Sequence, residues 1–172
     1  MKPEVWEKLS SRARAVLNYG IAQKGWLEQS RMPRFIAAVP FLAGCDMPLE
    51  TAFSHLMIYL VALDESAKDI YFHKPHDDEH IYNRLNPVFS FSGGDQKILQ
   101  CCKDLMALCM VSNYKKDMEN DIKRGKYNPL NSGVWDGDAL IKELIQRIET
   151  NITPEISAFY TPQEALRGYW RD

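Results

Sequence analysis

The chain has 172 residues, enough for one domain whose hydrophobic core needs neither disulfides nor a metal to hold it together. Hydrophobic residues make up 45% of the chain and charged residues 26%, which is the composition of a globular protein and excludes a disordered one. The net charge of −2 comes from 21 basic and 23 acidic residues mixed along the chain. It provides no strongly basic field, so we expect neither a nucleic-acid partner nor attachment to a membrane surface.

The sequence favours a cytoplasmic location. Its N-terminus, Met-Lys-Pro-Glu-Val-Trp-Glu-Lys, has no apolar core of a signal peptide. The longest apolar run is shorter than the roughly 20 residues that a transmembrane helix takes. The four cysteines (Cys45, Cys101, Cys102 and Cys109) lack the spacing of a zinc site or a disulfide framework, so we expect buried free thiols in a reducing compartment.

Two helices are predicted before residue 45. From Pro3 to Ala22, apolar residues recur at spacings of three and four. A second, short helix is expected over 32–43, ending at Gly44. Pro40 has no N–H to donate, so we expect this helix to be kinked or interrupted at Val39.

The stretch 47–72 predicts the central helix of the fold. Asp46 is suited to cap it, and Pro48 is tolerated in its first turn. Its apolar seam is Leu49, Phe53, Leu56, Leu60, Leu63, Ala67 and Ile70. Between Leu56 and Leu63 the other positions are apolar too, which is typical of a helix surrounded by its neighbours.

The rest of the chain is also predicted to be mainly helical. A long connection over 73–94 should contain a short helix over 77–85 and an extended stretch at 88–91. The longest helix is expected over 96–124, capped by Asp95 and ended by Gly125.

After a turn-rich connection over 125–137, an amphipathic helix is predicted over 138–150. Thr153 and Thr161, each followed by proline, predict the starts of two short C-terminal helices, and Glu164 completes a capping box. The expected fold is therefore an all-α single domain (1–172), a bundle of four to six helices around 47–72. An α+β fold with 88–91 in a small sheet is the alternative.

A cluster of polar side chains at 73–80 is the candidate metal site. If Asp77 caps a helix, His76 and His80 lie one turn apart on one side of it, a spacing at which imidazoles bind divalent metals together with carboxylates. The candidate ligands are His73, His76, His80, Asp77, Glu65 and Asp69. Helix capping and solvation select the same residue types, and this is the ordinary explanation of the cluster.

A pocket beside the expected central helix is the second candidate site. Its lining would be His55, Tyr59, Phe89 and Phe91. His55 can serve as an acid–base group, but a half-buried histidine with one hydrogen bond is the more usual role.

Three functions remain open from the sequence. The chain can act through protein contacts, with a protein partner or as a homodimer; it can bind a divalent metal or use one in hydrolysis; or it can bind a small molecule in the pocket beside 47–72. No catalytic residue is assigned, so the sequence leans away from an enzyme.

Overall fold

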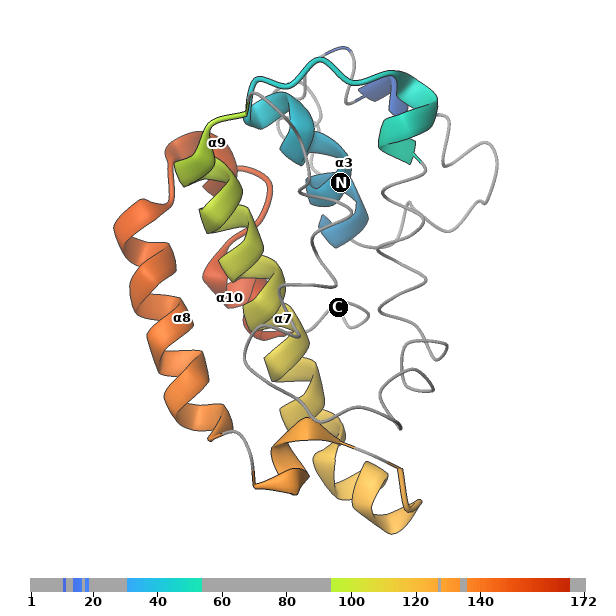
Figure 1. The fold of residues 1–172 in the computed structure, drawn as a ribbon, viewed down its shortest axis with the longest axis vertical. Helices are drawn as coiled ribbons and strands as arrows, with labels where there is room; N and C mark the ends of the chain where they lie inside the picture. The colour runs from blue at the N-terminus through green and yellow to red at the C-terminus, as the bar shows by residue number, and fades with distance from the viewer. Residues whose placement is uncertain are drawn as a thin grey trace.

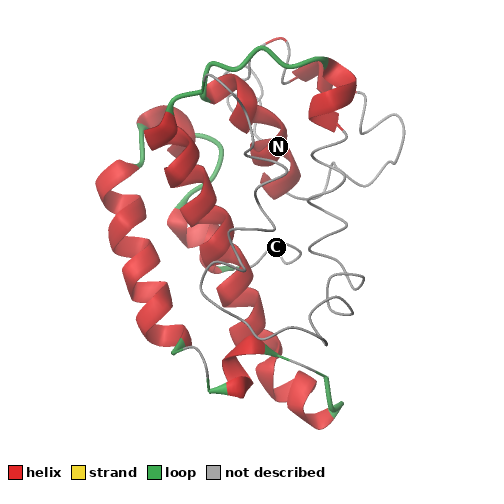
Figure 2. Ribbon diagram, viewed as in Figure 1, coloured by secondary structure: helices red, strands yellow, loops and turns green. Residues whose placement is uncertain are grey.

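The computed structural model describes residues 11, 14–16, 18, 31–53, 94–126, 128–133 and 136–167. Within these ranges the regular elements are all helical and no residue belongs to a strand (Figures 1 and 2). The prediction of an all-α bundle is confirmed. The expected short helix at 77–85 and extended stretch at 88–91 lie outside the described residues, and the single-domain assignment of 1–172 stays a prediction.

Helix α7 (Gln96–Lys123) is the longest described element and spans ~42 Å. It begins where Asp95 accepts hydrogen bonds from the backbone N–H groups of Lys97 (2.9 Å) and Ile98 (3.3 Å). It ends before Gly125, whose φ of 62° suits a residue without a side chain. The prediction of a helix over 96–124 with these two end signals is confirmed.

The middle of α7 is buried around its whole circumference, and this makes α7 the central helix of the described part. The buried positions are Leu99, Cys101, Cys102, Asp104, Leu105, Met106, Ala107, Leu108, Cys109, Met110, Val111 and Ser112. The sequence placed 47–72 at the centre. Of that range, 49–53 is helical and 54–72 lies outside the residues described.

Helix α8 (Gly137–Asn151) runs antiparallel to α7 and covers one of its faces (Figure 1). Two ion pairs give the direction, since Lys115 meets Asp138 at the start of α8 and Asp104 meets Arg147 near its end. Asp136 caps α8 through its side chain. The helix buries Leu144 and Ile148 of its apolar face, as the amphipathic pattern over 138–150 predicted. Residues of α7 beyond Lys115 therefore project past the beginning of α8.

Helix α3 (Arg31–Leu42) continues through Pro40. Of the two alternatives predicted at Val39, a kink or an interruption, the interruption is wrong. The carbonyl of Val39 accepts a hydrogen bond from the N–H of Ala43 (3.0 Å), and the carbonyl of Pro40 accepts one from Cys45 (2.8 Å). Pro40 cannot donate a hydrogen bond to the carbonyl of Ile36, and the burial of Val39 and Pro40 in the core offsets this loss. The end itself falls where predicted, with Gly44 at a φ of 78°.

The short elements η1 (Pro129–Ser132), α9 (Pro154–Ser157) and α10 (Pro162–Leu166) complete the described structure. Thr153 and Thr161 cap the last two helices, and the capping box of Thr161 with Glu164 is formed, as predicted. The turn between them carries Phe159 and Tyr160 into the core. These C-terminal helices close the core beside α7 and α3.

Part of the N-terminal region also packs in the core. Residues 11, 14–16 and 18 are helical, in agreement with the helix predicted over 3–22, and Val16 is fully buried. Among the described helices, none is both long and apolar enough to cross a membrane.

Candidate functional site

The site residues predicted from the sequence all fall outside the described residues. They are the metal candidates His73, His76, His80, Asp77, Glu65 and Asp69, and the pocket candidates His55, Tyr59, Phe89 and Phe91. Both sites stay predictions. Within the ranges that the structure does describe, no three His, Cys, Asp or Glu side chains are grouped closely enough to hold a metal ion.

A buried carboxylate between α7 and α8 is the most unusual charged group in the described structure. Asp104 is a charged residue, yet it lies in the apolar middle of α7 and is buried from solvent. Its Oδ1 accepts a hydrogen bond from Nε2 of Gln100 at 3.1 Å. A buried charge is tolerated only when it is paired and hydrogen-bonded, so Asp104 depends on its partners.

Arg147 on α8 is the cationic partner of Asp104. Its Nε donates to Oδ2 of Asp104 at 3.2 Å and its Nη2 to Oδ1, so the two groups meet through both carboxylate oxygens. Its Nη1 also reaches Oε1 of Glu143, one turn earlier on α8, at 3.2 Å. A planar guanidinium makes this paired contact and an ammonium does not, because only the former has parallel N–H groups. The contact fits one register of α8 on α7 and stabilises it.

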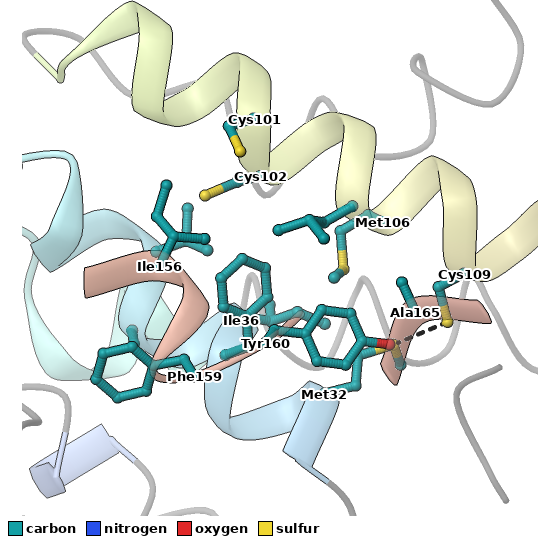
Figure 3. Packing of buried hydrophobic residues seen from close by; sticks show 14 of the residues in the cluster. Met32, Ile36, Cys101, Cys102, Met106, Cys109, Ile156, Phe159, Tyr160 and Ala165 are labelled. Carbon is teal, nitrogen blue, oxygen red and sulfur yellow. Dashed lines mark hydrogen bonds between the residues drawn. The ribbon is translucent and has the colours of Figure 1, made fainter. Parts of the chain in front are cut away.

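Sulfur-containing side chains gather where α7 faces α3 and the C-terminal helices (Figure 3). Cys109 of α7 contacts the sulfur of Met32 of α3 at 3.7 Å, and the ring of Tyr160 stacks on Phe35 with centroids 5.3 Å apart. Sulfur and aromatic side chains fill irregular gaps well. The contacts join three segments that are far apart in the sequence.

The thiols in this cluster are protected from ionisation. Burial, with a smaller contribution from the negative charge of Asp104, raises the pKa of Cys101 to about 11. Burial raises the pKa of Cys109 to about 12, although a hydrogen bond with Tyr160 and the charge of Lys116 act in the opposite direction. All four cysteines are free and buried, as predicted. Because the thiolate is the reactive form, these groups suit packing and not nucleophilic chemistry.

The buried carboxylate of Asp121 and the side chain of Asn128 hold the chain that follows α7. Asn128 uses its amide group to donate to Oδ2 of Asp121 (3.1 Å) and to the carbonyl of Tyr114 (2.8 Å). Its side-chain oxygen accepts from the N–H of Leu130 at 3.0 Å, which starts η1. One asparagine thus holds the returning chain against the last turns of α7.

The projecting end of α7, residues 116–123, carries an apolar side chain in contact with solvent. Ile122 is 50% exposed, and no other large hydrophobic side chain in the described ranges is classed as exposed. It lies 18 residues, or five whole turns, after Asp104 and therefore on the face of α7 that α8 covers. Helix α8 begins opposite Lys115, two turns before Ile122, and does not extend over it. Met118, one turn before it, is half-buried.

The sequence contained signals for these features that the helical pattern alone did not reveal. Asp104 interrupts an otherwise apolar stretch, which indicates a charge that needs a partner. Which basic residue pairs with Asp104 depends on the register between α7 and α8, and the two helices are separated in sequence by the 124–136 connection. That register comes from packing and is not encoded in either helix alone.

No protein-family model matches this chain, and neither a curated protein nor a solved structure matches it. The functional argument therefore depends on the residues and contacts of this chain. The class that they define is an all-α protein with a central helix and a projecting helix end.

Proposed function

We propose that this protein acts through protein contacts, and that it associates with a second copy of itself through the projecting end of α7. The observation that carries the proposal is the half-exposed Ile122, which lies on the continuation of the α7 face that is buried against α8 around Asp104. Single exposed apolar residues are common on protein surfaces. The position of this one, on the continuation of a buried helix face, is what favours an interface.

The surroundings of Ile122 suit contact between identical surfaces. Glu119 and Lys123 are exposed on the same side of α7, one turn apart and opposite in charge. In a two-fold dimer a patch meets its own copy, so residue pairs occur twice. If the two helix ends cross antiparallel, Glu119 of one copy approaches Lys123 of the other. The small size of the patch predicts weak association, since stable interfaces bury about 1,200 Å² or more.

The contacts of two buried carboxylates stabilise the helices next to the projecting end of α7. Asp104 is bonded by Gln100 and Arg147, and Asp121 by Asn128. These groups hold α8 and the chain after α7 in place. They thereby leave the end of α7 supported but not covered by α8.

We further propose that the protein resides in the cytoplasm. Four buried thiols remain unpaired, and Cys101 and Cys102 are adjacent on one helix. Unpaired cysteines at this frequency fit a reducing compartment better than an oxidising one.

The proposal is tested by sedimentation velocity of the full chain over a range of concentrations, in the presence of a reductant. We expect the weight-average sedimentation coefficient of the wild type to rise with concentration. The Ile122→Lys variant should stay monomeric, because a charge in the contact must lose its water. Gln146→Lys is the matched control, since it adds the same charge at an exposed position of α8; it should associate like the wild type.

Two results would overturn the proposal. One is a wild type that remains monomeric at every concentration. The other is association that Ile122→Lys and Gln146→Lys leave equally intact, since the contact would then lie elsewhere on the surface. Circular dichroism and thermal unfolding of both variants show whether they keep the wild-type fold, which an exposed substitution should not disturb.

A further inference from the structure

We draw no further inference here: the strongest candidate, the apolar patch of Met118 and Ile122 at the projecting end of α7, is the surface on which the proposed function already depends, and nothing in the described structure shows what covers it.

Discussion

The guanidinium of Arg147 and the carboxylate of Asp104 form a two-point contact across the α7–α8 interface, and the carboxylate has no access to solvent. This contact differs from the ion pair of Lys115 with Asp138 across the same interface, whose side chains are 47% and 78% exposed. Because a buried charge is stabilised only by its partner, the two pairs should respond very differently to substitution.

Replacing Arg147 with alanine should lower the free energy of unfolding by about 2–3 kcal/mol. Loss of a partner from a buried pair typically costs roughly 3–5 kcal/mol, and the lower value is expected here because Arg147 is 38% exposed and water partly screens it. Arg147→Lys should recover only part of the loss, because a lysine cannot make the paired contact. Urea unfolding measures each change.

The exposed pair provides the control for this prediction. Lys115→Ala should change stability by less than about 1 kcal/mol, as is usual for surface ion pairs. The double variant Asp104→Leu/Arg147→Met should be more stable than Arg147→Ala, because it removes the buried charge together with its partner. Equal effects of Lys115→Ala and Arg147→Ala would contradict the assignment of Asp104 as a charge that needs Arg147.

Asn128→Asp should destabilise the protein by at least about 2 kcal/mol near neutral pH. The new carboxylate would face Asp121 and the carbonyl of Tyr114, where the amide now donates two hydrogen bonds. Repulsion between the two carboxylates disfavours their joint charged state in the folded variant, so protonation favours folding and part of the loss should return on acidification. Denaturant unfolding at several pH values measures this recovery.

Asn128→Ala is the comparison for this effect, since it removes the same hydrogen bonds without adding a charge. It should be destabilised at neutral pH and recover less on acidification than Asn128→Asp does. If the two variants show the same pH dependence, the contact between residues 121 and 128 is not what holds the chain after α7.

Gly94→Ala should cost about 1–3 kcal/mol, the usual range for overpacking. A Cβ at this position would lie 2.8 Å from Sγ of Cys45 and 3.1 Å from Cβ of Ala43. The adjoining N–H of Asp95 donates to the carbonyl of Ala43 at 2.8 Å, so the backbone has little freedom to move away. Combining Gly94→Ala with Cys45→Ala should give a smaller loss than the sum of the two single losses. Strict additivity would argue against this close approach.

Stability should fall in alkaline solution because of the buried thiols. In the unfolded chain a thiol loses its proton near its ordinary pKa of 9.0, whereas in the folded protein Cys101 does so at about 11 and Cys109 at about 12. Between these values the unfolded chain binds fewer protons, so raising the pH favours unfolding. Stability is therefore at its full value below about pH 9 and declines above it, by roughly 1 kcal/mol per pH unit for each thiol.

Unfolding of Cys101→Ala and of the wild type between about pH 8 and pH 10.5 separates this effect from the titration of tyrosine and lysine. The variant should show a shallower decline with pH, whatever its stability at neutral pH. Parallel curves for the two proteins would show that the pKa of Cys101 is not raised by folding.

The helical architecture was predictable because the signals for it are local. Asp95 and Gly125 mark the two ends of α7, and Thr161 with Glu164 mark the start of α10, through hydrogen bonds that reach no more than a few residues. At Pro40 the sequence left a kink and an interruption of α3 as alternatives, and the structure excludes the interruption. Proline removes one hydrogen bond, and the turn after it is supported by tertiary packing, which sequence spacing does not reveal.

The candidate site was less predictable, since it depends on contacts between distant segments. Arg147 meets Asp104 because α8 packs on α7, and Ile122 lies two turns beyond Lys115, where α8 starts. Periodicity shows that a helix has an apolar face but not how far its neighbour extends along it. The metal and pocket candidates within 54–93 lie outside the described residues and stay predictions.

Disulfide trapping of an Ile122→Cys variant tests the proposed contact between two copies most directly. The four native thiols are buried and should react slowly, so a cross-link should come from the new cysteine. The account predicts a covalent dimer from mild oxidation of Ile122→Cys at a concentration where the wild type associates, and much less from Gln146→Cys on the exposed face of α8. Equal yields from the two variants, or no dimer from Ile122→Cys, would contradict association through the end of α7.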